Sequence, residues 1–474
     1  MSSRKARIHE LSEKTAADRA HWIERNRFFY DEDLKYMRFL VPPGLRILEL
    51  GCGIGNTLAA LEPSYGVGVD FSQSMLDIAR QRHSGLVFIL GDIEEPGILS
   101  NLEDKFDIII LSDTIGYLDD CEQALLKLHE LCHVDTRIIL SYYNTLWEPA
   151  YNFGEWLGLK SPSVELNWLT TDDICNLLDL SDFDVIKRDW RQLWPRKLFG
   201  LASLINRFIA PMPLIRKLCW RNYIVARSAV CIPESNPSVT VLVPCKNEKG
   251  NIEDVITRMP RFCDDLEILF VEGNSSDGTF AEINRVSEKY GQLDIKMMRQ
   301  PGTGKGDAVR SGFAAARGDI LMILDADLTT PPESLPKFYR VLTNGKAEFV
   351  NGSRLVYPME SDAMRFLNLV ANLIFSMLFS WLLNQRFTDT LCGTKALYRR
   401  HYIQIDAGRD YFGEFDPFGD FDLIFGASKL NLKVIEIPVR YASRTYGESQ
   451  ISRFRHGWLL LKMVIFAFRK LKAV

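Results

Sequence analysis

Short apolar runs with the length and composition of β-strands alternate with helix-like stretches in this chain of 474 residues, and the alternation occurs twice. Such alternation is typical of β-α-β units, which build a mostly parallel sheet covered by helices. A segment rich in proline and small polar residues, 233–238, interrupts the pattern. We therefore predict two α/β domains, 1–232 and 239–474, joined by this linker. The strand-like runs lie at 47–50, 66–70, 87–90 and 106–111, and again at 239–243, 266–271, 294–298 and 320–324.

Composition argues against nucleic-acid binding, a disulfide framework and structural zinc. The net charge of −4 does not favour a nucleic-acid partner. The nine cysteines are odd in number and contain no C-x-x-C pair, which argues against a disulfide framework or structural zinc and for a reducing compartment. The N-terminus shows no apolar leader. We expect a cytoplasmic protein.

A glycine-rich loop follows the first strand of the first half, and an acid ends each of the next two strands. The loop reads Glu-x-Gly-x-Gly-x-Gly, and glycine allows a ligand to approach the backbone closely. An acid at the end of the second strand of a doubly wound sheet can accept hydrogen bonds from a ribose. The loop spacing differs from the G-x-G-x-x-G of dinucleotide-binding folds, so we reject that alternative. The candidate residues are Glu49, Gly51, Gly53, Gly55, Asp70 and Asp92.

Over roughly residues 25–190, these features resemble class I S-adenosylmethionine (SAM)-dependent methyltransferases. The resemblance implies a Rossmann-like fold and SAM as cofactor, with the glycine loop and Glu49 near its methionine part. It also implies that Asp70 holds the ribose, that Asp92 approaches the adenine amine, and that the active face lies near 112–117. Four residues are candidates for the methyl acceptor's site, although packing or surface roles suit them as well: Tyr117, His129, Tyr142 and Tyr143. The alternative is a domain that keeps the fold as a non-catalytic SAM-binding or scaffold module.

Two carboxylates, Asp325 and Asp327, follow the buried run 320–324 in the second half. Oxygen ligands of this kind suit Mg²⁺ or Mn²⁺. A divalent cation held there can bridge a diphosphate and neutralise the charge on a departing nucleoside diphosphate. A P-loop at 302–305 is excluded, because the spacing of its first glycine and the Ser/Thr after the lysine are both missing.

Seven motifs in order resemble family 2 glycosyltransferases of the GT-A fold, over nearly all of 238–450, and most of all the dolichol- and polyprenyl-phosphate sugar synthases. They lie at 243–248, 276–279, 304–306, 325–327, 351–354, 389–395 and 444–449. The resemblance implies that Asp325 and Asp327 hold the metal and are catalytic. It also implies a nucleotide-sugar site formed by Pro244, Glu248, Glu272, Lys305 and Asp325. The family usually has a second acid where this chain has Gly273, so the choice between UDP- and GDP-sugars stays open.

The acceptor of the sugar is predicted from charge. A hydroxyl acceptor needs a general base, for which Asp422 is the candidate, whereas a lipid phosphate is already ionised and needs cations. Arginine suits multidentate contacts with phosphate. We predict an acceptor-phosphate site of Arg354, Lys395, Arg444, Ser449 and Arg453, with Arg444 also catalytic. A basic solvated loop is the alternative.

Two apolar segments, near 363–385 and 456–472, favour a lipid acceptor. The run 366–383 carries one narrow polar stripe of Asn368, Asn372, Ser376 and Ser380, and between 451 and 474 there are six Lys/Arg and no acid. Amphipathic helices with basic flanks lie in an anionic membrane interface. Buried core or dimer helices are the alternative. A second basic stretch, 185–230, has ten Lys/Arg against one acid, and suits a surface-docking helix or a linker helix equally.

Together these features predict a bifunctional transferase at the cytoplasmic face of a membrane. One domain transfers a sugar from a nucleotide-sugar to a polyprenyl-phosphate-like or other lipid acceptor, and the other methylates an unknown acceptor with SAM. The rival hypothesis is a glycosyltransferase that acts on a soluble or surface glycan. Self-association is a further partnership that the sequence leaves open.

Overall fold

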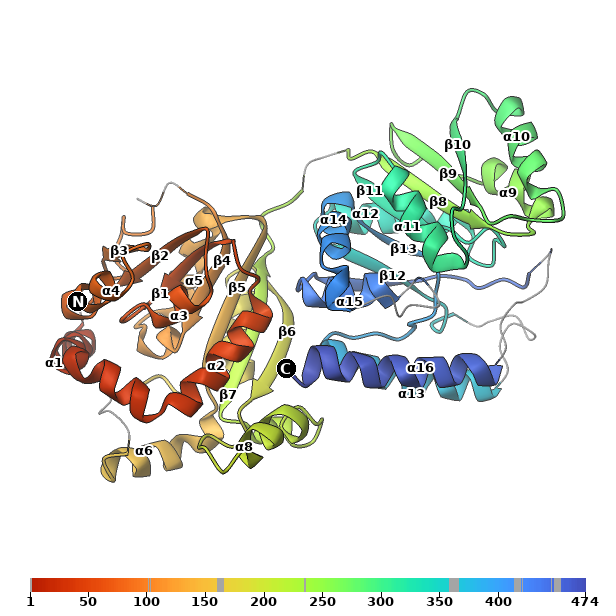
Figure 1. Ribbon diagram of the computed structural model, residues 1–474. Coiled ribbons are helices and arrows are strands. Elements are labelled where there is room, and N and C mark those ends of the chain that lie inside the picture. The colour runs from red at the N-terminus through yellow and green to blue at the C-terminus, as the bar shows by residue number, and fades with distance from the viewer. Residues whose placement is uncertain are drawn as a thin grey trace. The chain divides into compact units, whose positions relative to one another are not determined.

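The computed structural model describes residues 2–100, 102, 104–159, 166–233, 236–357, 366–412, 419, 421–444, 446 and 453–474, with the side chains of 366–371 and 453–457 excluded. The chain divides into two compact units, residues 1–231 with 472–474, and residues 232–471 (Figure 1). Part of the predicted linker, 234–235, lies outside the described residues.

The first unit is built on a seven-stranded sheet of order β3-β2-β1-β4-β5-β7-β6. Pairing is parallel from β3 through β5, whereas β7 runs antiparallel to both β5 and β6. The central strands are buried on both faces, which explains their nearly continuous apolar sequence. The strands are β1 Arg46–Leu50, β2 Tyr65–Asp70, β3 Val87–Leu90, β4 Phe106–Ser112, β5 Cys132–Tyr143, β6 Phe183–Arg191 and β7 Arg221–Ser228.

Helices surround this sheet, and two long ones precede its first strand. The first begins at the N-cap Ser2, whose side chain accepts a hydrogen bond from the backbone of Lys5. Thr170 and Asp173 form a reciprocal capping box that starts α7. The helices are α1 Ser3–Arg25, α2 Arg27–Leu40, α3 Asn56–Ala60, α4 Gln73–Arg82, α5 Cys121–Lys127, α6 Glu148–Trp156, α7 Thr171–Leu180 and α8 Leu201–Leu204, which continues as a π-helical turn to Ile209.

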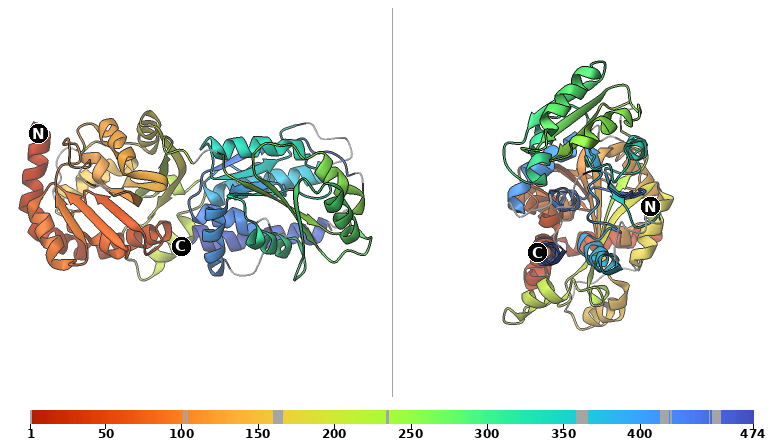
Figure 2. Two further views of the ribbon diagram at one scale, coloured as in Figure 1. Left: turned by 90° about the horizontal axis from the view of Figure 1, so that it is seen from above. Right: turned by 90° about the vertical axis from the view of Figure 1, so that its right-hand side faces the viewer.

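The second unit has its own seven-stranded sheet, of order β10-β9-β8-β11-β13-β12-β14. Strand β13 runs antiparallel to both of its neighbours, and every other pairing is parallel. The expectation of two α/β units with mostly parallel sheets is confirmed (Figure 2). The strands are β8 Val239–Cys245, β9 Leu266–Glu272, β10 Asp294–Arg299, β11 Ile320–Ile323, β12 Phe349–Ser353, β13 Lys395–Tyr398 and β14 Val434–Pro438.

The described helices of the second unit include a pair, α13 and α16, that lie side by side (Figure 1). No helix among the described residues is both long enough and apolar enough to cross a membrane. The helices are α9 Ile252–Thr257, α10 Thr279–Lys289, α11 Lys305–Ala315, α12 Leu335–Thr343, α13 Phe366–Leu383, α14 Arg399–Ala407, α15 Phe421–Lys429 and α16 Arg453–Ala467.

The orientation of α13 is the reverse of that in an ordinary surface helix. Asn372 and Ser376, from its polar stripe, are buried, whereas Leu373, Ile374 and Met377 are exposed. The Ser380 hydroxyl hydrogen-bonds to the backbone of the loop that follows the helix. Asn372 and Ser376 of the polar stripe therefore face the protein, while the apolar side chains of Leu373, Ile374 and Met377 face outwards.

Candidate functional site

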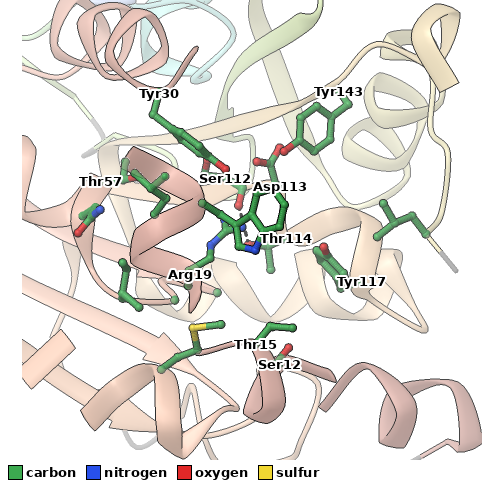
Figure 3. Close-up of a pocket in the computed structure, with 18 of the residues that line it drawn as sticks. Ser12, Thr15, Arg19, Tyr30, Thr57, Ser112, Asp113, Thr114, Tyr117 and Tyr143 are labelled. Carbon is green, nitrogen blue, oxygen red and sulfur yellow. Dashed lines mark hydrogen bonds between the residues drawn. The ribbon is translucent and has the colours of Figure 1, made fainter. Parts of the chain in front are cut away.

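A cavity of about 600 Å³ lies in the first unit, above the carboxyl ends of β1, β2, β3 and β4. Helices α1 and α2 and the glycine loop after β1 complete its walls. Figure 3 shows the side chains of Thr15, Arg19, Tyr30, Asp113 and Tyr143 around this space. The carboxyl ends of adjacent parallel strands meet at one edge of the sheet, which is where such folds bind their ligands.

The glycine loop contributes backbone to the cavity wall. Gly51 and Gly53 have φ angles of +73° and +53°, a region that L side chains rarely adopt. A Cβ at Gly51 would lie 2.4 Å from the Thr114 hydroxyl oxygen, so this position requires glycine for packing. A Cβ at Gly53 would meet no protein atom within 4 Å, because Gly53 borders the cavity itself. The space beside Gly53 is therefore available to a ligand. Gly55 has positive φ as well.

The three predicted carboxylates of this site all line the same cavity. Asp70 accepts hydrogen bonds from the backbone N–H groups of Gly53, at 2.8 Å, and Ser72, at 2.9 Å. Asp92 pairs with Lys5 at 2.5 Å. Glu49 accepts a bond of 3.0 Å from the backbone of Leu58, and its burial raises its pKa to about 8. The structure thus brings together residues that are more than forty positions apart in the sequence.

Helix α1 supplies cavity residues that the sequence-based prediction missed. Lys5, Ser12, Thr15 and Arg19 all line the space. The guanidinium carbon of Arg19 lies 6.0 Å from the centre of the Tyr30 ring. Nothing local to the sequence of α1 indicates that this helix crosses the cavity, so these residues could not be identified from the sequence alone.

A buried cluster of charged residues, with tyrosines beside it, forms another part of the cavity wall. Arg221 pairs with Asp113, which follows β4, and with Asp33 of α2 at 3.1 Å. Asp113 has a positive φ of 62°, an unusual conformation for a residue with a side chain. Burial raises the pKa of Asp113, and Arg221 opposes that rise.

Two of the four candidates for the methyl acceptor's site, Tyr117 and Tyr143, line the cavity. The other two have structural contacts. The Tyr142 hydroxyl donates a hydrogen bond of 2.6 Å to the Asn167 carbonyl. His129 bonds to the Ser181 carbonyl at 2.7 Å and stacks on Phe183.

In the second unit, Asp325 and Asp327 follow β11, and each faces a cation. The Lys305 ammonium lies 2.7 Å from Asp325 Oδ1. Arg444 lies 2.5 Å from Asp327 Oδ2, and the Thr329 hydroxyl donates to Asp327 Oδ1 at 2.8 Å. Burial acts to raise the pKa of Asp325, but nearby cations, first Lys305, outweigh it and lower the pKa. The ionised form of Asp325 is therefore favoured, which is the form that ligates a hard divalent cation. A bound cation has to share these oxygens with Lys305 and Arg444.

Arg444 joins the predicted metal residues to the predicted nucleotide residues. Its guanidinium also lies 3.7 Å from Glu248, which accepts a hydrogen bond of 2.7 Å from Asn251. Burial raises the pKa of Glu248. Glu272, buried at the end of β9, accepts a bond of 2.5 Å from the backbone of Ser275. Pro244 lies at the carboxyl end of β8, next to β9 in the sheet.

Gln300 was missed by the sequence-based prediction and lies beside Gly273, where the family usually has an acid. A Cβ at Gly273 would come within 3.1 Å of its carboxamide oxygen. The Gln300 amide nitrogen donates to the carbonyl of Gly304 at 2.7 Å.

The residues predicted for the acceptor phosphate occupy different environments. Arg354 is paired with the buried Asp389 through two hydrogen bonds of 2.6 and 2.8 Å. Lys395 is buried and donates to the Cys392 carbonyl. The charges of both nevertheless act on Asp325. Ser449 and the side chain of Arg453 lie outside the described residues.

Asp422, the candidate base, lies on α15 beside the start of α11. It borders a small space with Gly306, and Arg310 lies 3.6 Å from its carboxylate. Its pKa is raised by burial, which Arg409 and Arg310 oppose. A raised pKa suits a group that has to accept a proton.

Comparison with known families agrees with these two sites. Residues 18–188 match the sequence model of a methyltransferase domain, and residues 240–405 match that of glycosyl transferase family 2. The chain is a fusion of a methyltransferase domain and a family 2 glycosyltransferase domain. The two predicted families, the Rossmann-like and GT-A folds and the enzyme class are thereby confirmed.

Curated relatives include an undecaprenyl-phosphate 4-deoxy-4-formamido-L-arabinose transferase from Enterobacter sp. (strain 638). It is 28% identical over 228 residues, which is 47% of this chain and 65% of the relative. A glycosyltransferase from Bacillus subtilis (strain 168) is 36% identical over 188 residues, 37% of this chain and 43% of the relative. The chain thus covers less than two thirds of the length of both relatives. A solved SAM-dependent methyltransferase from Thermotoga maritima is 20% identical with a TM-score of 0.37, covering 46% of this chain and 99% of its own.

The raised pKa of Glu49 predicts a pH-dependent effect of the substitution Glu49→Gln. Glu49 has a usual pKa of 4.5 and about 8 when folded, so the folded state holds a proton that the unfolded state has lost. Stability is therefore lost as the pH rises from about 4.5 to about 8, and glutamine removes this loss. We expect Glu49→Gln to raise the free energy of unfolding of the methyltransferase domain above about pH 8, by at most a few kcal/mol, since one pKa unit is worth about 1.4 kcal/mol. Near pH 4.5 the gain should vanish. Calorimetric unfolding across this pH range measures it, and an equal effect at both ends would refute the raised pKa.

Proposed function

We propose that the second unit transfers a sugar from a nucleotide-sugar to a polyprenyl-phosphate-like lipid with the help of Mg²⁺ or Mn²⁺. The observation that carries the proposal is the set of ion pairs at the carboxyl ends of β8 and β11. Lys305 pairs with Asp325 there, and Arg444 lies between Asp327 and Glu248. Relatives from Enterobacter and Sodalis named as undecaprenyl-phosphate 4-deoxy-4-formamido-L-arabinose transferases support the lipid-linked acceptor.

The proposed residues divide the chemistry between them. Asp325 and Asp327 would hold the divalent cation, which supplies positive charge to the diphosphate of the donor. Lys305 and Arg444 add fixed cations beside the same carboxylates, where charge develops as the nucleoside diphosphate leaves. Pro244, Glu248 and Glu272 would contact the nucleotide. The acceptor phosphate needs no base because it is already an anion, so Arg354, Lys395, Ser449 and Arg453 would serve to bind it. Asp422 would act as base only towards a hydroxyl acceptor.

The metal proposal predicts that Asp327→Ala abolishes sugar transfer and metal-dependent nucleotide binding. The substitution removes one of two carboxylates and leaves Arg444 without this partner. Calorimetric titration of UDP and GDP in the presence of Mn²⁺ measures the loss. SAM titrated into the same variant is the internal control and should bind as to the wild type, because its proposed site belongs to the other unit. Unchanged Mn²⁺-dependent nucleotide binding would remove Asp327 from the ligand set.

We further propose that the first unit binds SAM in its 600 Å³ cavity and methylates an acceptor there. Gly51, Gly53 and Gly55 would present backbone to the methionine part near Glu49, and Asp70 and Asp92 would face the ribose and the adenine. The open space beside Gly53 and the shared cavity of the three acids support this fit. When bound, SAM supplies an electrophilic methyl group. Asp113, Tyr117 and Tyr143, which line the same cavity, would surround the acceptor.

SAM binding is tested by the pair Gly53→Val and Gly44→Val. Both glycines have positive φ, so valine is strained by the backbone conformation at either position. At neither would a Cβ meet a protein atom within 4 Å. Only Gly53 lines the cavity, so its valine should occupy ligand space. We expect Gly53→Val to eliminate calorimetric SAM binding and Gly44→Val to keep it. Equal affinities in the two variants would contradict the proposed position of SAM, and a folded wild type that binds no SAM would favour the scaffold alternative.

The second unit is proposed to act as a peripheral protein at the cytoplasmic face of a membrane, through α13 and α16. Leu373, Ile374 and Met377 of α13 and Leu461 and Ile465 of α16 are exposed on these neighbouring helices. The segment 451–474 has six basic residues and no acid, and among them Lys472 is buried beside Asp189 and takes no part in the attraction. An anionic interface attracts each nearby basic residue by about 1 kcal/mol and buries the apolar side chains.

The membrane proposal predicts that Met377→Asp weakens binding to anionic vesicles, because a charge replaces an exposed apolar side chain. The matched control is Ile403→Asp on α14, where the apolar residue is also exposed but belongs to another helix. Flotation with phosphatidylglycerol-containing vesicles at low and high salt measures the difference, with transfer to undecaprenyl phosphate followed in parallel. A wild type that stays unbound at low salt would favour the soluble-glycan alternative.

A further inference from the structure

A second exposed apolar surface lies on the methyltransferase unit, formed by α6 and the segment between β6 and β7. We call it the α6–α8 surface and define it by Phe153, Trp156, Phe199, Leu204, Leu214 and Leu218. Phe199 and Leu214 are 103% and 92% exposed. Large apolar side chains that gather at one exposed surface mark an interaction site.

The two parts of this surface are held together by specific contacts. The Trp147 indole, just before α6, donates to the Leu218 carbonyl at 2.9 Å and stacks on Trp220 with ring centres 4.5 Å apart. The Asn144 side chain donates to the Lys217 carbonyl at 2.8 Å. Asn206, next to α8, exchanges two hydrogen bonds with the backbone of Trp194. The exposed side chains are therefore presented by an ordered scaffold.

The segment between β6 and β7 contributes charge of one sign to the α6–α8 surface, whereas α6 itself carries the half-buried acids Glu148 and Glu155. No acidic residue occurs between 190 and 232, and Arg196, Lys197 and Lys217 are exposed there. Basic residues beside bulky apolar ones complement an anionic lipid interface. Pairing the β6–β7 segments of two copies would bring like charges together, so the charge of this segment favours a bilayer over self-association.

The cavity of the methyltransferase unit reaches this surface. Phe153, Leu157 and Arg196 line the cavity and are also exposed. Tyr151 and Trp220, which support the α6–α8 surface from within, line the cavity too and lie in edge contact at 5.3 Å. One side of the cavity wall is thus the underside of the exposed apolar surface.

We propose that the α6–α8 surface docks onto an anionic lipid bilayer and that an amphiphilic methyl acceptor enters the cavity from that bilayer. The docking part stands on the surface alone, whereas the acceptor class rests on the proposed SAM-dependent activity. Phe199 and Leu214 insert among the lipid chains, and Arg196, Lys197 and Lys217 contact the headgroups. The polar end of the acceptor passes between α6 and Pro195–Arg196 towards Asp113, while its apolar part stays in contact with Phe153 and Leu157.

Docking is tested by hydrogen–deuterium exchange on the full chain, with and without vesicles of phosphatidylcholine and phosphatidylglycerol. We expect the vesicles to slow exchange in residues 148–157 and 196–218. The double variant Phe199→Asp/Leu214→Asp should lose this protection and keep that of α13 and α16. The control Leu180→Asp replaces another exposed leucine outside the surface and should behave as the wild type. Vesicle protection of α13 and α16 alone would overturn the proposal, as would protection of 196–218 that depends on protein concentration without lipid.

The acceptor class is tested with labelled SAM and a total lipid extract carried in the same vesicles. We expect label in the lipid phase for the wild type, and a loss of it for the double variant with SAM affinity unchanged, since neither Phe199 nor Leu214 lines the cavity. A wild type that binds SAM and docks but labels no lipid would overturn the amphiphilic acceptor and leave SAM binding intact. A wild type that docks without binding SAM would refute the proposed methyltransferase activity and not the docking surface.

Discussion

Parallel strand pairing is the constraint on which both sites depend. The pairing of β1 with β2 and β4, and of β8 with β9 and β11, brings the carboxyl ends of separate strands to one edge of each sheet. At that edge the backbone leaves the sheet, so its N–H groups are no longer used in strand pairing. These N–H groups and the side chains beside them can face a ligand. In the first unit the edge carries Glu49, Asp70 and Asp92, and in the second it carries Glu272, Asp325 and Asp327.

Carboxylates gathered in this way repel one another and are costly to bury, so each group is compensated. In the methyltransferase domain Lys5 faces Asp92, Arg221 faces Asp113, and backbone N–H groups satisfy Asp70. In the glycosyltransferase domain Lys305 and Arg444 face the two acids after β11. Glu49 is the exception, because within the described part of the chain no cation pairs with its carboxylate, and burial raises its pKa instead. In the second unit the cations near Asp325 lower its pKa and favour its charged form, whereas in the first unit burial favours the protonated form of Glu49 beside the proposed ligand.

The two proposed membrane surfaces arise in different ways. Helix α13 buries Asn372 and Ser376 against its own unit and exposes apolar side chains, which reverses the usual pattern of a soluble helix. The α6–α8 surface comes from two connecting segments, one between β5 and β6 and one between the antiparallel strands β6 and β7, which leave the central parallel strands of the sheet undisturbed. Each unit thus carries its own candidate contact with lipid.

The sequence by itself determined what depends on neighbouring residues. Short stretches of sequence were enough to predict the strand positions, the glycine loop and the acids after β11, because strand burial and positive φ each favour particular residue types. The strand predicted at 320–324, for example, is β11 at Ile320–Ile323. The tertiary structure decided what depends on distant residues. It placed Arg19 and Lys5 of α1 in the cavity, turned the stripe of α13 inwards, paired Arg354 with Asp389 and brought Arg444 to Asp327, 117 positions away. Such contacts leave no local pattern, because a charged side chain has the same sequence signature whether its partner is solvent, a ligand or a distant acid.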